Sequence, residues 1–86
     1  MTYEQALIRV SEIVAEKTAT HVFDVKPGSE LKGELDCDDL DIVLIAITIE
    51  EEFGVDIPNK DIETCKTVSE LAVLAGGLLG SGSGPA

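Results

Sequence analysis

The densest group of chemically active side chains in this sequence is a cluster of carboxylates. The stretch LDCDDLDIV, residues 35–43, carries four aspartates in nine positions, immediately before an apolar run. Clustered carboxylates can hold Mg²⁺ or Ca²⁺, but the Asp-x-Asp-x-Asp-Gly order of an EF-hand loop is missing, so we predict no specific metal site. The remaining chemistry is electrostatic, because a field of this sign attracts basic protein surfaces.

The other reactive residues do not support nucleophilic catalysis. The only histidine, His21, is distant in sequence from Cys37 and Cys65, and neither cysteine belongs to a Cys-x-x-Cys motif. A zinc site would need more ligands at closer spacing, and a catalytic nucleophile would need an adjacent base. We therefore predict that the protein is not an enzyme, that the two cysteines are small buried thiols, and that His21 lies in a loop.

The net charge restricts the partners further. The chain carries a formal charge of −11, and the segment from Glu34 to Asp56 contains nine acidic residues and no lysine or arginine. Nucleic-acid binding is disfavoured, because neutralising phosphates requires cations. Solubility alone would explain a general excess of acid, but its concentration in one segment favours a docking surface for a basic partner.

The length of the chain allows one small domain. No apolar stretch among the 86 residues reaches the about 18 residues that a membrane span requires. The first ten residues lack the basic and apolar blocks of a signal peptide, so we expect a cytoplasmic monomer with no membrane partner. We assign residues 1–79 to the domain and expect residues 80–86, GSGSGPA, to form a flexible linker or an artificial tail.

The carboxylate cluster has to be positioned by helices, and the first helix is predicted at residues 3–17. Thr2 and Gln5 form a capping box at its start, and its apolar face comprises Leu7, Val10, Ile13 and Val14. Residues 18–37 contain Pro27-Gly28 and Gly33, so they form a long connection with at most one short helical turn. Five apolar residues are expected to hold this connection on the core: Val22, Phe23, Val25, Leu31 and Leu35.

The carboxylate cluster itself opens the second helix, predicted at residues 39–53. Asp38 is a suitable N-cap, and Asp39 and Asp41 lie where the helix dipole favours anions. Gly54 is a natural stop. The many β-branched residues would also fit a strand, but the length and the cap favour a helix.

Two further helices complete the layout. A short helix is predicted at residues 60–64 with Asn59 as its cap. A last helix follows Thr67, with Glu70 completing a capping box, and Gly76-Gly77 either ends or frays this helix. Its apolar positions are Val68, Leu71, Val73 and Leu74. The fold class is all-α, a small antiparallel bundle of three main helices and one short helix. The predicted core comprises Val10, Ile13, Val43, Ile49, Phe53, Ile62, Leu71 and Leu74.

The central segment, ELDCDDLDIVLIAITIEEEFGVDIP, resembles the acyl carrier protein family. That family reads Asp-Leu-Gly-x-Asp-Ser-Leu-Asp, then an apolar helix, then Glu-Glu-Glu-Phe, then Ile-Pro. The Lys-Thr-Val that opens the family's last helix is matched by residues 66–68, and the resemblance extends to about residue 75. The matching residues of the central segment are Leu35, Asp38, Leu40, Asp41, Val43, Glu50, Glu51, Glu52, Phe53, Ile57 and Pro58.

One departure from the family pattern bears directly on function. The resemblance implies a serine that carries 4'-phosphopantetheine, the cofactor of the family, and Asp39 occupies that position. A carboxylate oxygen could form only a labile acyl phosphate, so we expect no arm on this form. Two histories remain open: either the parent sequence has serine at position 39 and aspartate was introduced, or Asp39 is natural.

The resemblance also implies a docking surface at the start and along the second helix. We expect Asp36, Asp38, Asp41, Glu50, Glu51 and Glu52 to meet basic surfaces of acyl-handling enzymes or of a phosphopantetheinyl transferase. Leu44 and Ile47 would add an apolar centre if both are exposed; alternatively, a rotated helix would bury them. In relatives, a cleft between helices two and three shelters the acyl chain, and Cys65 is expected to line it here.

The resulting functional hypothesis is an acyl carrier protein-like carrier, a protein that presents a thioester-linked acyl group to enzymes, unprimed in this form. The alternative is a non-carrier binding or regulatory module that keeps the carrier fold and its acidic surface. The class of cargo, whether fatty-acyl, polyketide or aminoacyl, stays open.

Overall fold

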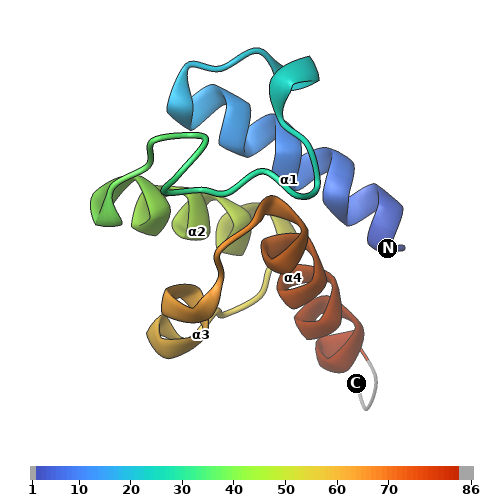
Figure 1. Ribbon diagram of the computed structural model, residues 1–86. Helices are drawn as coiled ribbons and strands as arrows, with labels where there is room; N and C mark the ends of the chain where they lie inside the picture. Colours follow the sequence, from blue (N-terminus) through green and yellow to red (C-terminus); the bar gives the residue numbers. More distant parts are fainter. Residues whose placement is uncertain (1, 84–86) are drawn as a thin grey trace.

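The computed structural model describes residues 2–83, with side chains described for residues 2–77. Four α-helices and one 3₁₀ turn follow one another: α1 (Tyr3–Thr18), η1 (Val22–Asp24), α2 (Asp39–Phe53), α3 (Asn59–Thr64) and α4 (Val68–Ser83). α1 crosses the upper part of the molecule, with α2 and α4 beneath it and the short α3 below α2 (Figure 1). The predicted all-α bundle with a long loop between its first two helices is confirmed.

The two helix starts that matter most are fixed by reciprocal capping boxes. Gln5 N donates to Thr2 Oγ1 at 3.2 Å, and the Gln5 side chain accepts from Thr2 N at 3.0 Å, as predicted. At α2, Asp41 N donates to Asp38 Oδ1 at 2.8 Å, and Asp38 N donates back to Asp41 Oδ2 at 3.2 Å. The role of Asp41 in this second box was not predicted. Both boxes satisfy amides that a helix leaves unpaired at its first turn.

Two further predicted helix boundaries are confirmed, and two are wrong. α2 ends at Gly54, which takes the left-handed conformation at φ 67°, and α4 begins with hydrogen bonds between Thr67 and Glu70 in both directions. Asn59 is the first helical residue of α3 and not its cap, because Pro58 precedes the helix and makes no side-chain cap.

The second error concerns the end of α4. The helix does not end at Gly76-Gly77 but runs on to Ser83. Gly76 faces α1, since a Cβ on it would lie 3.7 Å from the Ala6 side chain. Packing against α1 thus supports the helix through a residue pair of low helical propensity. Residues 84–86 of the expected tail lie outside the described residues, and the division into residues 1–79 and 80–86 stays a prediction.

The core forms where α1, α2 and α4 meet, with single contributions from α3 and the loops. Six of the eight predicted core residues are buried: Val10, Ile13, Ile49, Phe53, Ile62 and Leu71. Leu74 is only partly buried and packs against this cluster. Val43 is wrong as a core residue, because 43% of it is exposed, and Val73, expected on the apolar face of α4, is 58% exposed. Val43 instead lines an open pocket with Ile62 of α3, and Val73 lines another with Asp61 and Thr64.

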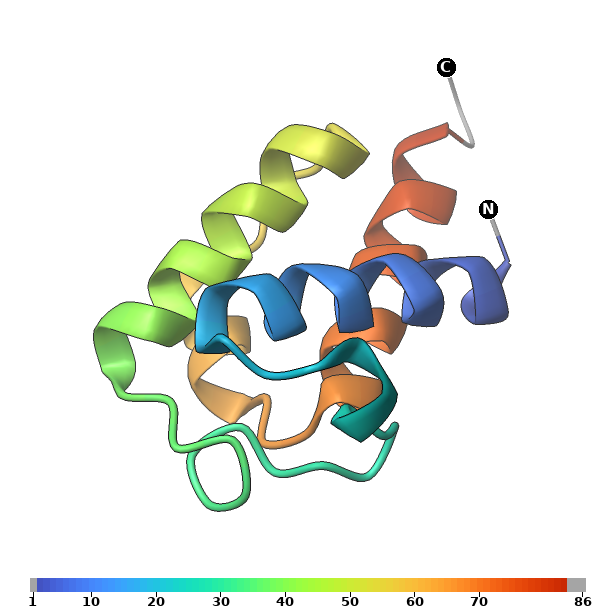
Figure 2. The ribbon, with the colours of Figure 1, turned by 90° about the horizontal axis from the view of Figure 1, so that it is seen from above.

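The long loop is held to the core and also caps α4. Val25 and Leu31 are buried and Leu35 is partly buried, whereas Val22 and Phe23, expected on the core, are exposed. The loop runs along one end of the bundle before it reaches α2 (Figure 2).

Backbone hydrogen bonds fix the loop in that place. The carbonyls of Pro27 and Ser29 accept from Ser69 N at 2.9 Å and Val68 N at 3.2 Å, and Leu31 N donates to the Lys66 carbonyl at 2.9 Å. The loop therefore satisfies the first amides of α4, which explains how a connection of this length can remain ordered.

Candidate functional site

The N-terminal corner of α2 presents a carboxylate to solvent. Asp39 is the first residue of α2, and 90% of its side chain is exposed. Lys32 reaches it from the loop, with 2.7 Å between Lys32 Nζ and Asp39 Oδ1. This hydrogen-bonded ion pair lowers the pKa of Asp39 and raises the pKa of Lys32. The corner is held by the capping box of Asp38 and Asp41, so the position of Asp39 is set by a rigid element.

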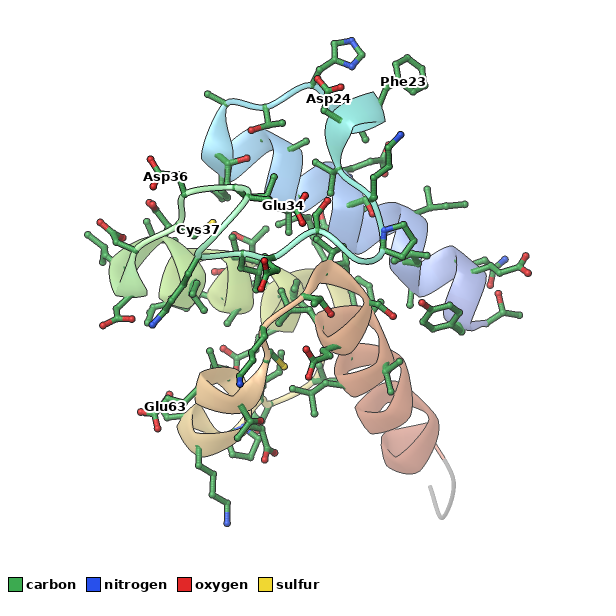
Figure 3. The ribbon with its side chains drawn as sticks, in the orientation of Figure 1. Phe23, Asp24, Glu34, Asp36, Cys37 and Glu63 are labelled. Atoms are coloured by element: carbon green, nitrogen blue, oxygen red, sulfur yellow. The ribbon has the colours of Figure 1, made fainter. Side chains whose placement is uncertain are left out.

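The corner lacks a hydroxyl group. No serine, threonine or tyrosine occurs between residues 30 and 47 of the chain. The nucleophile nearest in sequence is the thiol of Cys37, which is buried at 5% exposure and points toward the bundle (Figure 3). Burial and the neighbouring charges of Asp41, Asp38 and Asp36 raise the pKa of this thiol, which keeps it in the unreactive protonated form.

A pocket of about 390 Å³ opens beside this corner, between α2, α3 and the loop. Apolar and charged side chains both line it: Ile42, Val43, Ile62 and Cys65, together with Lys32, Asp39 and Glu63. Cys65 thus lines the pocket between α2 and α3 as expected, although it is only partly buried. Its pKa is raised, first by burial and then by Glu70 and Asp61. A pocket of this kind can hold a short apolar chain.

Most of the predicted docking carboxylates are engaged within the molecule. Glu52 forms a bidentate ion pair with Arg9 of α1, and this pair lowers the pKa of Glu52. Glu50 Oε2 accepts from Ile57 N at 2.9 Å. Asp38 and Asp41 bond one another in the capping box.

Two predicted docking carboxylates have no such partner. Within the part of the chain whose side chains are described, Asp36 and Glu51 make neither an ion pair nor a side-chain hydrogen bond. Asp36 points out of the loop (Figure 3). The sequence analysis missed Arg9 and Lys32 as partners, because the bonded pairs lie on different elements and no local motif links them.

The apolar centre of the surface is exposed. Leu44 and Ile47 are each 43% exposed, so the reading in which a rotated α2 buries them is wrong. Val43, equally exposed, and Leu40, at 65%, lie on the same side of the helix. α2 thus shows apolar side chains to solvent between its carboxylates.

Outside this surface, the structure places the histidine in the loop as predicted. His21 Nδ1 accepts from Phe23 N, and the two rings stack at 4.9 Å between centroids. Phe23 projects away from the helices (Figure 3). None of the helices formed by the described residues is long and apolar enough to cross a membrane.

Comparison with solved structures places this geometry in a known fold. The fold matches the solved structure of an acyl carrier protein from Enterococcus faecalis, with a TM-score of 0.76 over 91% of this chain and 99% of that one. At 24% sequence identity this likeness establishes the fold alone.

Comparison of sequences identifies the family. A family model described as "Phosphopantetheine attachment site" matches residues 9–74. Acyl carrier proteins from Myxococcus xanthus and Micrococcus luteus are each 33% identical over 67 residues, which is 78% of this chain and 85% and 83% of theirs. One from Rubrobacter xylanophilus is 33% identical over 70 residues, 81% of this chain and 86% of its own.

These matches also decide between an enzyme and a carrier. The family model describes an attachment site and the relatives are acyl carrier proteins, so the prediction that the protein is a carrier and not an enzyme is confirmed. The partners that the family implies are enzymes that handle acyl groups. From the match over residues 9–74 and the identity to its relatives, the chain belongs to the acyl carrier protein family.

Proposed function

We propose that this protein is an acyl carrier protein-like carrier whose present form cannot receive the phosphopantetheine arm, because Asp39 stands at the attachment position. One observation carries the proposal: Asp39 is the exposed first residue of α2, directly after its cap, in a segment without any hydroxyl side chain. This placement matches the family serine in its motif. The proposed setting is the cytoplasm, where it docks as a monomer on acyl-handling enzymes or a phosphopantetheinyl transferase.

The chemistry of the corner does not fit the arm. A hydroxyl oxygen forms a stable phosphodiester, whereas a carboxylate oxygen would form an acyl phosphate that water hydrolyses. The Asp39 carboxylate is also ion-paired with Lys32, which lowers its pKa and makes it a weaker nucleophile. What the chain itself supplies at this corner is positioning, since the capping box holds residue 39 toward solvent.

The test compares the chain with Asp39→Ser. Each is incubated with coenzyme A and a broad-range phosphopantetheinyl transferase, and the intact mass is measured. We expect the added mass of the arm only on the serine variant. Asp38→Ser is the matched control, since it places a hydroxyl one residue away and serine is itself a good N-cap. We expect this control to stay unlabelled.

Two results of this labelling experiment would contradict the proposal. Labelling of the unchanged chain would refute the assignment of Asp39 as a block. Labelling of Asp38→Ser would place the attachment position one residue earlier.

A second function remains a candidate, because Leu44 and Ile47 are exposed on α2. In this reading the chain is a non-carrier binding or regulatory module that uses the carrier surface to engage a partner. It gains support if Asp39→Ser stays unlabelled with several transferases while its fold is unchanged. A labelled serine variant that passes an acyl group to an acyltransferase would argue for the carrier.

A further inference from the structure

Phe23 has the most exposed large apolar side chain among the described residues. It is 77% exposed, and its ring projects from η1 away from the helices (Figure 3). The other phenylalanine, Phe53, is buried in the core, and Val25 is buried below the turn. An aromatic ring gains more free energy from burial than most side chains. The fold therefore leaves one large apolar group uncovered on η1.

Several interactions hold this ring in one position. His21 Nδ1 accepts from Phe23 N at 3.2 Å, and the two rings stack at 4.9 Å between centroids. Asp24 N donates to the His21 carbonyl at 2.8 Å. Val25 N donates to the Val22 carbonyl at 3.1 Å, which closes the turn. Because the turn is already ordered, a contact made by the ring costs little additional conformational entropy.

The charge near the ring differs from that of the rest of the molecule. Lys26 Nζ donates to the Phe23 carbonyl at 2.9 Å, so an ammonium group lies beside the turn. Residues 17–29 contain two lysines, Lys17 and Lys26, and one acid, Asp24, whereas the whole chain has a charge of −11. A local cation favours a carboxylate on a partner, but the acidic remainder of the surface repels a broadly acidic one. The acid of a fitting partner is therefore confined to the point of contact.

A second copy of the chain and an anionic lipid surface fit this region less well. Each copy has a charge of −11, so two copies repel one another, and an anionic membrane repels the chain in the same way. One ring and Val22, which is 37% exposed, offer far less apolar area than a stable flat interface buries. A ring that protrudes from a turn fits a pocket, as aromatic anchors do at the centre of interfaces.

We propose that Phe23 is an anchor for a partner protein, and that its ring enters an apolar pocket of that protein whose rim carries a carboxylate facing Lys26. The contact lies on η1 and not on α2. It depends neither on residue 39 nor on the phosphopantetheine arm, so it goes beyond the proposed function and adds a second place of contact to the molecule.

Three substituted β-cyclodextrins reproduce the chemistry of such a pocket. Their apolar cavity admits a phenyl ring, and the rim carries carboxymethyl groups, no charge or trimethylammonium groups. Each host is titrated into the unchanged chain at about 50 mM NaCl, and its dissociation constant is measured from the NMR chemical shifts of Phe23. We expect the carboxylate host to bind at least about threefold more tightly than the ammonium host. The net charge of −11 alone predicts the opposite order, so a reversed order would overturn the proposal.

Variants locate the contact, with binding of the carboxylate host measured at the amide signals of η1. Phe23→Ala should weaken binding at least about tenfold, because the ring is the group that enters the cavity. Leu40→Ala is the matched control, since Leu40 is 65% exposed on α2; it should change binding by less than about twofold. Lys26→Gln should weaken binding about twofold and Asp24→Asn should strengthen it, because they remove opposite charges beside the ring. Equal losses in Phe23→Ala and Leu40→Ala, or no effect of Lys26→Gln, would refute the assignment.

Thermal unfolding distinguishes an anchor from a structural role of the ring. The Tm of Phe23→Ala should lie within about 2 °C of the unchanged chain, because an exposed ring adds little to the stability of the fold. A fall of more than about 5 °C would mean that the ring serves the fold, and the proposal would then lose its basis.

Sedimentation velocity and vesicle binding test the other occupants. We expect a monomer that does not bind phosphatidylcholine vesicles. Dimers or vesicle binding that disappear in Phe23→Ala would show that a second copy or a lipid surface covers the ring, and either result would overturn the proposal. No coenzyme A or transferase enters these assays, so a failure of the anchor and a failure of arm attachment are measured separately.

Discussion

Replacing Asp38 by alanine should loosen the corner of α2 on which the proposed function depends. The substitution removes the acceptor for Asp41 N, a hydrogen bond of 2.8 Å, and keeps the backbone amide of residue 38 that donates to Asp41 Oδ2. Loss of an N-cap costs about 1 kcal/mol, and loss of a negative charge near the helix N-terminus costs roughly a further 0.5 kcal/mol. We expect the free energy of unfolding to fall by about 1.5 kcal/mol.

The assay is thermal unfolding followed by circular dichroism at 222 nm. For a domain of this size, the expected loss corresponds to a fall in Tm of about 6–12 °C. Asp38→Asn is the matched control, because asparagine retains the side-chain acceptor and removes only the charge. It should lose no more than about a third of the alanine effect. If asparagine and alanine destabilise equally, or if alanine has no effect, then the capping hydrogen bond does not hold this corner.

Two further predictions concern the end of α2 and its link to α1. Gly54→Ala should destabilise the fold by about 1 kcal/mol in urea unfolding, because Gly54 has φ 67°, which alanine adopts only at a cost. A Cβ at this position meets no other atom within 4 Å, so the cost is conformational and not steric. Gly28→Ala is the control, since Gly28 has no left-handed backbone; it should be close to neutral, and equal effects of the two substitutions would refute the argument. Arg9→Gln should be less stable than the unchanged chain at pH 7. Because Arg9 lowers the pKa of Glu52, this contribution is full above the ordinary glutamate pKa of about 4.3 and is lost as pH falls through the lower folded value. The urea midpoints of the two proteins should therefore begin to converge below about pH 4, and a gap that persists unchanged to pH 2 would contradict the assignment.

The helix starts were predictable because their signals are local. Thr2 with Gln5, and Thr67 with Glu70, bond across three residues, so the residue types and their spacing contain the whole interaction. Asp38 was identified for the same reason. The Asn59 cap failed because Pro58 takes the preceding extended position, which leaves Asn59 inside the helix.

The end of α4 was not predictable from propensity. Gly76-Gly77 is a strong local stop, yet the helix continues because Gly76 packs beside Ala6 of α1. Helical periodicity likewise identified the apolar residues of α2 and placed Ile49 and Phe53 correctly in the core, but the prediction that Val43 joins them was wrong. When nearly every position of a helix is apolar, the sequence pattern does not indicate which face is buried. The positions of α1, α3 and α4 decide that Val43 is exposed to solvent and that Ile49 is buried.

The candidate site likewise combines features that the sequence determines with features that only the tertiary structure decides. The sequence by itself determined the family motif, the cap at Asp38 and the carboxylate at position 39 that replaces a hydroxyl, since each depends on residue identity and short spacing. Only the tertiary structure decided which carboxylates have a partner, because Arg9 and Glu52 lie 43 residues apart and Lys32 reaches Asp39 from the loop. An ion pair requires two side chains to come within a few ångströms, and for residues on different elements that proximity is created by the packing of the helices and is not encoded in their sequence spacing.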